Sequence, residues 1–275
     1  MHPLPNLGNT CYLNSVLQLL VSLNIMKYPD DMHIFINSLD YPEIHRQNDQ
    51  HDFLLYLLNK VHLASYKKTK MPIQPDQSSL WQKANKNLYL YGYNINNKSS
   101  PYIYLSHASK FIGQRIYKKQ CLKCKNIKIS FDTFNILEVD IEGENNVYSC
   151  LDKMTQPYVL SVICKKCGHD SSACAMSIWK KPKILAILLK RYGINGAKNN
   201  NTVAFPENLN LTGISIHSQP RDYGILGVLH HHGHNMANGH CTYSHNVNGT
   251  WYNYNDNIIS VNNSIYSDAY ILIYV

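Results

Sequence analysis

This sequence of 275 residues has few charges and no long apolar run. Charged residues make up only 16% of it, and 18 acidic residues stand against 26 basic ones. Its strongest apolar run, at 184–189, has the length of a strand, far below the roughly 20 residues of a membrane-spanning helix. The start of the chain also lacks a basic segment followed by an apolar one, so we expect no signal peptide. We therefore expect an intracellular protein of the cytoplasm or nucleus, in a host cell if the source is a virus.

The polarity of the chain comes mainly from uncharged side chains. Hydrophobic residues make up 44% of the sequence, which also contains 21 tyrosines and a visible excess of asparagine. This composition is typical of a folded globular protein and excludes a disordered one. The formal net charge of +8 permits binding to nucleic acid, but its short lysine clusters are better explained as solvated surface. We expect neither a nucleic-acid partner nor a membrane partner.

The first part of the chain has the apolar spacing of helices. Apolar residues at three- and four-residue intervals predict a helix that begins near Cys11 and a second one from about Asn48. The polar stretch 65–110 is interrupted by prolines, so we expect loops with short helices there.

From residue 111 onward the pattern becomes typical of strands, with alternating, β-branched and aromatic residues. Helices followed by mostly antiparallel strands indicate an α+β fold. The expected strands are 114–117, 127–131, 134–139, 175–179, 183–189, 223–229, 240–245, 250–254 and 269–275.

Four of the eight cysteines form two C-x-x-C pairs, Cys121 with Cys124 and Cys164 with Cys167. Two such knuckles supply four thiolates to one tetrahedral Zn²⁺ and leave no position for water, which is typical of a structural site. The 39 residues between the pairs exceed the roughly 15 to 20 of a compact zinc module, so we expect hairpin strands to project between the knuckles. The alternative is two unrelated pairs of thiols, but the lysines around both pairs favour turns.

Cys11 is a candidate nucleophile because of its predicted place in the first turn of a helix. The helix dipole lowers the pKa of a thiol there and increases the thiolate fraction. A candidate base, His240, opens a predicted strand, and a turn near Asn248 and Gly249 would bring it close to Asn255. Without that partner, His240 would be better explained as a surface histidine on a strand.

The segment around Cys11 closely resembles the cysteine box of the ubiquitin-specific proteases, which are papain-like deubiquitinases. It reads Asn-Leu-Gly-Asn-Thr-Cys-Tyr-Leu-Asn-Ser, followed by Leu-Gln. Further segments resemble, in the right order, the glutamine-aspartate box, the zinc-finger entry, the palm strand, the histidine box and the closing strand. These segments are 47–53, 111–113, 188–192, 239–240 with 251–256, and 269–274.

The resemblance implies a papain-like α+β fold in one catalytic domain spanning 1–275. A helical thumb would occupy 1–64, and connecting loops would occupy 65–110. Zinc-ribbon fingers would occupy 111–180, and an antiparallel β palm would occupy 181–275.

The resemblance also implies a role for each matching residue at the reaction centre. Cys11 would attack the carbonyl of ubiquitin's terminal glycine, and His240 would deprotonate the thiol and later protonate the leaving amine. Asn255 would orient the imidazole, a role that neighbouring Asp256 could share or take over. Asn6 would help the Cys11 backbone N–H to stabilise the oxyanion.

The implied partner is ubiquitin or a ubiquitin-conjugated protein, bound by a monomer. Asp49 and Asp52 match acidic positions that would pair with arginines of the ubiquitin tail, although helix N-terminal charge explains them equally well. Gly239 would keep the approach to the cleft narrow.

Three positions depart from the family pattern. Cys241 stands where an aromatic residue usually follows the catalytic histidine, and Asn48 and Gln50 differ within the glutamine-aspartate box. Two alternatives stay open beside a deubiquitinase. Asn255 at the third triad position and the missing aromatic leave open a catalytically weak ubiquitin-binding module, and the net charge of +8 leaves open a zinc-ribbon nucleic-acid binder.

Overall fold

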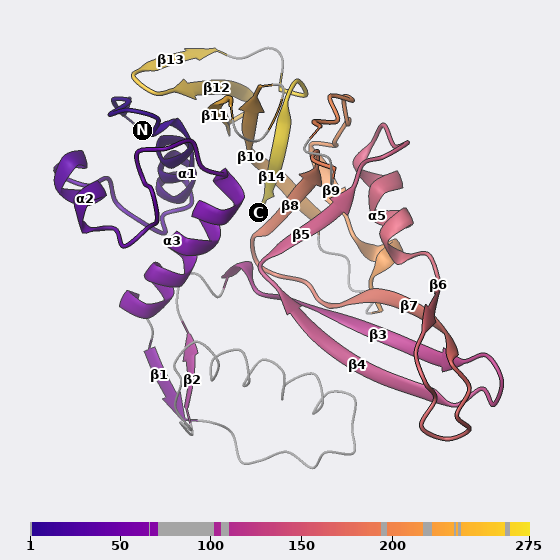
Figure 1. Cartoon of the computed structure of the whole chain (residues 1–275). Helices are drawn as coiled ribbons and strands as arrows, with labels where there is room; N and C mark the ends of the chain where they lie inside the picture. Colours follow the sequence, from indigo (N-terminus) through magenta and orange to yellow (C-terminus); the bar gives the residue numbers. More distant parts are fainter. Residues whose placement is uncertain are drawn as a thin grey trace.

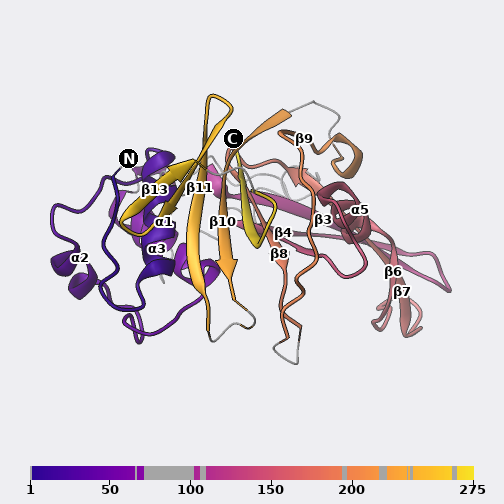
Figure 2. The same cartoon turned by 90° about the horizontal axis from the view of Figure 1, so that it is seen from above.

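A computed structural model describes residues 2–65, 67–70, 102–105, 110–193, 197–216, 222–233, 235, 238–261 and 265–275. Helices from the start of the chain lie against one end of a large sheet, and a narrower sheet extends away from its other end (Figures 1 and 2). This arrangement confirms the predicted α+β class. Over the described ranges, none of the helices combines the length and the apolar character that crossing a membrane requires.

The N-terminal helices build one of two hydrophobic cores. They are α1 (Cys11–Ser22), α2 (Met32–Ser38) and α3 (Gln50–Ser65). Leu13 and Leu17 of α1 are fully buried with Phe53 of α3 and Tyr243 of the large sheet. Each such apolar side chain stabilises the fold by about 1.5–3 kcal/mol. The predicted helix near Cys11 is confirmed at its first residue, and the second begins two residues later than expected.

The large sheet carries most of the second half of the chain. Its strand order is β13-β12-β11-β10-β14-β8-β5, with β9 paired to β10. The last strand of the chain, β14, therefore lies in the interior of the sheet. The strands are β5 (Ile136–Asp140), β8 (Leu185–Lys190), β9 (Asn208–Asn210), β10 (Asp222–His232), β11 (His240–Val247), β12 (Thr250–Asn255), β13 (Ile258–Val261) and β14 (Ala269–Tyr274).

The second sheet is long and narrow and has the order β4-β3-β7-β6, antiparallel throughout. Figure 1 shows it projecting from the body of the molecule. Gly113 lies at its root, where a Cβ would be 2.2 Å from the ring of Phe134, so a side chain there would push the first two strands apart. The strands are β3 (Gly113–Cys121), β4 (Ile127–Phe134), β6 (Tyr158–Ser161) and β7 (Ser171–Lys180).

Several features differ from the sequence predictions or were missed by them. Within 65–110, most of the described residues form the antiparallel strands β1 (Lys67–Lys70) and β2 (Tyr102–Leu105), while Ser65 ends α3, and the rest of that stretch lies outside the described residues. β5 pairs in parallel with β8, so it belongs to the large sheet although it was expected within the fingers at 111–180. The helices α2 and α5 (Val147–Thr155) were not predicted, nor was the 3₁₀ turn η2 (Thr212–Ile214).

Candidate active site and metal centre

The turn before α1 presents Cys11 at the N-terminus of the helix. The Asn6 side-chain oxygen accepts hydrogen bonds from the backbone N–H groups of Gly8 and Thr10, both at 3.1 Å. Gly8 has φ +95°, a conformation that other residues rarely adopt. Cys11 is only 2% exposed, and the positive end of the helix dipole favours its thiolate form.

A β-hairpin brings His240 and Asn255 together, as the sequence predicted. β11 and β12 pair antiparallel, and Asn248 and Gly249 between them have φ values of 53° and 87°. Two successive positive φ values are typical of the tight turn that joins adjacent strands. The Nε2 atom of His240 donates to Oδ1 of Asn255 at 2.6 Å, which leaves the other ring nitrogen for Cys11.

The electrostatics of the site favour a charged cysteine–histidine pair. A hydrogen bond from Cys241, with a further one from His240, lowers the pKa of the Cys11 thiol to about 4 despite its burial. The hydrogen bond to Cys11, supported by that to Asn255, raises the pKa of His240 to about 9, again against burial. Between these two values the site holds a thiolate and an imidazolium, the protonation state of an activated cysteine nucleophile.

Asp256 binds two asparagine side chains and does not take the hydrogen bond of His240. Its Oδ2 accepts from the Asn6 amide at 2.9 Å, and its Oδ1 accepts from the Asn14 amide at 2.8 Å. Its backbone carbonyl also accepts from the N–H of Leu4 at 2.9 Å. The structure thus assigns the hydrogen bond on His240 to Asn255, while Asp256 ties the hairpin to the turn that precedes Cys11.

The two acidic residues near α3 have different surroundings. Asp49 accepts a hydrogen bond from the Tyr270 hydroxyl at 2.7 Å and one from the backbone N–H of His51, also at 2.7 Å. It lies close enough to affect the titration of Cys241 and His231 at the site. The Asp52 side chain is 71% exposed and lies beside His51. Asp49 is therefore fixed at the site, whereas Asp52 is at the surface.

Gly239 packs against the neighbouring strand β10. A Cβ at this position would lie 2.5 Å from Cε1 of His231 and 2.7 Å from the carbonyl oxygen of His232. His231 is buried and bonds through Nδ1 to the Tyr192 hydroxyl at 2.6 Å, and burial lowers its pKa. The contact that requires glycine at position 239 is thus with the buried side chain of His231, and it fixes the residue that immediately precedes His240 in the sequence.

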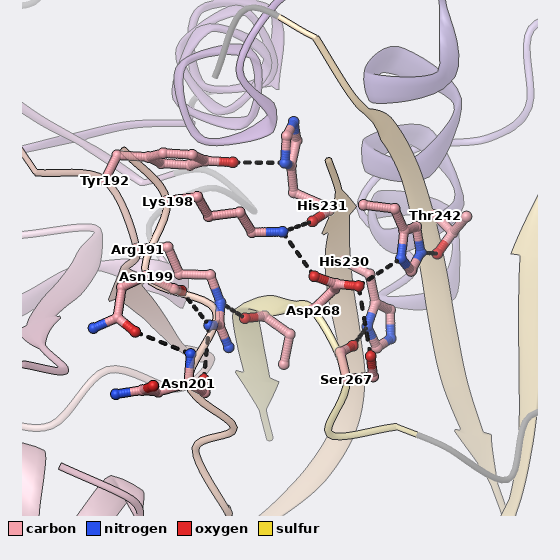
Figure 3. A network of polar contacts seen from close by, with 12 residues as sticks. Arg191, Tyr192, Lys198, Asn199, Asn201, His230, His231, Thr242, Ser267 and Asp268 are labelled. Carbon is pink, nitrogen blue, oxygen red and sulfur yellow. Dashed lines mark hydrogen bonds and ion pairs between the residues drawn. The ribbon is translucent and has the colours of Figure 1, made fainter. Parts of the chain in front are cut away.

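A network of polar side chains connects β10 to the two segments that contain Lys198 and Asp268 (Figure 3). The fully buried Lys198 ammonium donates to the His231 carbonyl at 2.6 Å and to Asp268 Oδ1 at 2.7 Å. The other oxygen of Asp268 lies 3.2 Å from Nδ1 of His232, whose Nε2 contacts the Thr242 hydroxyl at 3.0 Å. These contacts, made by a fully buried ammonium and a carboxylate that is about one third exposed, hold the surrounding segments in one geometry.

Arg191 anchors one of the two loops in this network. Its side chain is almost completely buried and donates to three backbone carbonyl oxygens, those of Ala269, Asn199 and Asn201. The loop also pairs with the segment before His240, through a bridge between Ala197 and Asn235. The Arg191 side chain and this bridge thus hold the segment that precedes Gly239 against the loop.

The four cysteines of the C-x-x-C pairs meet at the tip of the narrow sheet. Their sulfur atoms all lie within 4.8 Å of one another, with Cys121–Cys167 at 3.6 Å and Cys124–Cys164 at 3.7 Å. Four ligands at the usual zinc–sulfur distance would be separated by about 3.8 Å. All four cysteines are free thiols, so the arrangement can bind a metal ion.

Comparison with known proteins identifies the family. A model described as ubiquitin carboxyl-terminal hydrolase matches residues 27–274. The chain belongs to the ubiquitin carboxyl-terminal hydrolase family. The resemblance of the sequence to the ubiquitin-specific proteases is thus confirmed at the level of the family.

Relatives within this hydrolase family match almost the whole chain. Usp2 of Drosophila melanogaster is 26% identical over 98% of it, and ubiquitin carboxyl-terminal hydrolase 11 of Schizosaccharomyces pombe is 27% identical over 92%. The human 17-like protein 15 of the same family is 25% identical over 99%. The chain spans 34%, 76% and 53% of these three proteins, respectively.

Solved structures share the fold. The chain aligns over its full length with 69% of a chain in the SAGA DUB module of Ubp8, Sgf11, Sus1 and Sgf73 bound to monoubiquitin, with a TM-score of 0.72 and 21% identity. The same module bound to ubiquitin aldehyde gives a TM-score of 0.71 at 21% identity, again with full coverage of this chain and 69% of the other. These matches confirm the predicted hydrolase fold with helical thumb, β palm and cysteine-tipped fingers.

Several residues that build the site were not found from the sequence. Tyr270 lies in a run of aliphatic residues that the sequence assigns only to a closing strand, and its hydroxyl was the available signal of a second role. Lys198 and Asp268 are 70 positions apart, and nothing local to either residue indicates an ion pair. Gln50, which departs from the family pattern, is fully buried and donates to the Ser15 hydroxyl at 2.7 Å. This hydrogen bond gives the unusual residue a structural role.

Proposed function

We propose that this chain is a thiol-dependent deubiquitinase that cleaves the peptide or isopeptide bond after the C-terminal glycine of ubiquitin. The observation that carries the proposal is the charged pair formed by Cys11 and His240, with Asn255 on the second nitrogen of the imidazole. Membership of the hydrolase family and the names of the relatives support ubiquitin as the substrate.

The proposed reaction uses these residues in sequence. The Cys11 thiolate attacks the glycine carbonyl, and a C–S bond forms while the C–N bond breaks. The His240 imidazolium gives its proton to the leaving amine and then removes a proton from the water that hydrolyses the thioester. Asn255 keeps the ring aligned for both transfers.

Asn6 is the proposed side-chain donor to the oxyanion. An amide nitrogen carries two hydrogens, and Asp256 accepts one of them at 2.9 Å. The second hydrogen then remains for the substrate, together with the backbone N–H of Cys11. The Asn6 oxygen is already bound to the turn before the helix, so the donor is oriented before substrate arrives.

Acidic groups near the site are the proposed contacts for the basic tail of ubiquitin. Asp49 is fixed by Tyr270 and retains a carboxylate that can pair with an arginine. Asp52 is exposed on the first turn of α3 and can reach a residue further along the tail. Gly239 and His231 would form the opposite wall of the cleft.

A ubiquitin probe with a C-terminal electrophile tests this proposal. We expect a covalent adduct that is absent in Cys11→Ala and strongly reduced in His240→Ala. Cys150→Ala is the matched control, since Cys150 is buried in α5 away from the site and its loss should leave labelling intact. An adduct that persists in Cys11→Ala would refute the assignment, and binding without any adduct would favour a ubiquitin-binding module instead.

The metal at the four-cysteine centre is proposed to be one structural Zn²⁺. An all-thiolate set suits zinc and offers no open position for a reaction. Cys121 ends β3, Cys124 lies between β3 and β4, and Cys164 and Cys167 lie between β6 and β7, so the ion would hold the two hairpins of the narrow sheet together. Metal analysis should give one zinc per chain, lost when Cys164 is replaced by serine.

We also propose that the chain acts as one catalytic domain and as a monomer. Asn6 and Asp256 are hydrogen-bonded although 250 positions apart, so the site requires both ends of the described chain. Light scattering of the purified chain should give the mass of one copy both alone and in a complex with one ubiquitin.

A further inference from the structure

Three histidine rings form a column on one face of β10 and β11. The rings of His230 and His232 have their centroids 5.8 Å apart and their planes 7° apart. His232 stands directly opposite His240 in the antiparallel ladder, and these two rings are stacked with centroids 6.5 Å apart at 25°, within the range in which aromatic rings interact. His240 therefore has a ring on its face, in addition to Asn255 at its Nε2 atom.

Both nitrogens of the His232 ring are hydrogen-bonded. An ionised carboxylate can only accept, so the Nδ1–H group donates to Asp268 Oδ2 at 3.2 Å, and Nε2 then accepts from the Thr242 hydroxyl at 3.0 Å. Asp268 is held in turn by the buried ammonium of Lys198 at 2.7 Å (Figure 3). The ring cannot turn about its Cβ–Cγ bond without loss of one of these contacts, so its plane is fixed.

His230 forms the buried end of the column. Its Nδ1–H group donates to the carbonyl oxygen of Ser267, and its Nε2 atom accepts from the hydroxyl of Ser244, both at 2.9 Å. Burial lowers the pKa of this imidazole to about 4, so the ring is uncharged at neutral pH. His232 thus packs between a fixed, uncharged ring and the ring of His240, which is charged in the resting site.

The hydrogen bonds of His232 are not needed to join these segments. Lys198 already connects β10 to Asp268, because its ammonium donates to the carbonyl oxygen of His231 at 2.6 Å as well as to the carboxylate. The His232 side chain is also 41% exposed, so it contributes little to the hydrophobic core. A partly exposed ring that is fixed at both nitrogens and faces His240 is better explained by its effect on that residue.

We propose that His232 is a positioning residue that holds the imidazole of His240 in the plane required for its proton transfers. The proposal rests on the proposed role of His240 as the acid and base of the reaction. His240 uses both ring nitrogens, one toward Cys11 and the other on Asn255, so rotation of the ring would misalign both at once. His232 restricts that rotation from the face of the ring. It transfers no proton itself, since both of its own nitrogens are already hydrogen-bonded.

This role predicts a loss in kcat without a loss of substrate affinity. Misalignment of a proton-transfer group acts on the chemical step, whereas the proposed contacts of the ubiquitin tail are unchanged. We expect His232→Ala to lower kcat about tenfold on a fluorogenic ubiquitin substrate, with KM changed by less than about twofold. A residue that only supported the sheet would lower the thermal unfolding temperature and leave kcat per folded chain unchanged, and that result would overturn the proposal.

Two further variants separate the ring from its hydrogen bonds. His232→Phe keeps a ring beside His240 without the hydrogen bonds and should recover most of the lost kcat. His232→Asn keeps a polar group for Asp268 but no ring on His240, and it should behave like His232→Ala. His245→Ala is the matched control, because His245 is a partly exposed histidine of β11 that stacks on Tyr243, and it should retain full kcat. An asparagine variant as active as the unmodified chain, or a phenylalanine variant as slow as alanine, would overturn the proposal.

Proton NMR of the full chain without ubiquitin supplies a measurement that does not depend on turnover. The Nε2–H group of His240 donates to Asn255, and its proton exchanges slowly with water only while the ring stays in place. This proton should exchange faster in His232→Ala than in the unmodified chain, and His232→Phe should restore slow exchange. Equal exchange in all three chains would overturn the proposal. An unmodified chain that shows the slow proton but cleaves no ubiquitin would refute the proposed function instead, so the two failures are distinguishable.

Discussion

Replacement of Asp256 by alanine should weaken both stability and catalysis, and it should lower the pKa of His240 only slightly, because the charge of Asp256 is the smallest of the causes that raise it. The carboxylate accepts from the Asn6 and Asn14 amides, and hydrogen bonds to a charged group contribute about 1.5–3 kcal/mol each. The Asn6 contact is exposed to water and should contribute less than this range. We therefore expect a loss of about 2 kcal/mol in the free energy of unfolding.

The effect on rate follows from the freedom that Asn6 gains. Removal of an oxyanion donor lowers kcat by roughly 10²–10³. In Asp256→Ala, Asn6 stays tied to Gly8 and Thr10 through its oxygen, so the loss should be only part of this, about tenfold to hundredfold in kcat. KM should change little, because the donor acts on charge that develops during the reaction.

A double-mutant cycle with Asn6→Ala on a fluorogenic ubiquitin substrate tests this reasoning. If Asp256 acts through Asn6, its replacement should lower kcat much less in the Asn6→Ala background than in the unmodified chain. Asp256→Asn is the matched control, since asparagine tolerates the φ of +50° at this position and retains one acceptor. Equal losses in both backgrounds would refute it.

Three further predictions follow from the site and the fingers. The profile of kcat/KM against pH should be bell-shaped, with limbs near pH 4 and pH 9 set by Cys11 and His240; a single limb would contradict the charged pair. Cys164→Ser, or a strong chelator, should lower the thermal unfolding temperature and weaken ubiquitin binding in calorimetry, while Cys11 alkylation persists. Gly239→Ala should lower kcat/KM at least tenfold, because the new Cβ would displace His231 or the strand; wild-type activity would show that the strand yields freely.

The same pKa shifts predict how stability depends on pH. The pKa of Cys11 falls from about 9 unfolded to about 4 folded, so its contribution is full above pH 9 and is lost as the pH falls towards 4. The pKa of His240 rises from 6.5 to about 9, so its contribution is full below pH 6.5 and is lost as the pH rises through 9. Denaturant titrations across this range should therefore find that Cys11→Ala removes most of the dependence.

Local patterns predicted those parts of the fold whose causes are local. Helical apolar spacing located α1, and the Asn248–Gly249 turn predicted the hairpin that joins His240 to Asn255. The cysteine spacing predicted the cluster at the finger tip in the same way. In each case the residues that determine the geometry are neighbours in the sequence.

The features that were missed depend on distant contacts or on a weak local pattern. α2 is short and buries Ile36, so its sequence does not show the repeated three- and four-residue apolar spacing that predicts a helix. The parallel pairing of β5 with β8 depends on the path of the chain between the two strands. Alternation of apolar and polar residues predicts a strand but not which strand it pairs with. The role of Asp256 was open in the sequence because its partners, Asn6 and Asn14, lie at the other end of the chain.

The interior position of β14 has a consequence for when the candidate site is complete. This strand lies between β10 and β8, so the large sheet stays split until Ala269–Tyr274 has been inserted. Asp49, which contacts Tyr270 of this strand, is likewise without its partner until then. A chain that carries Cys11 but has not inserted β14 is therefore expected to lack an assembled site, and deletion of Ala269–Tyr274 should abolish labelling by the ubiquitin probe as effectively as Cys11→Ala.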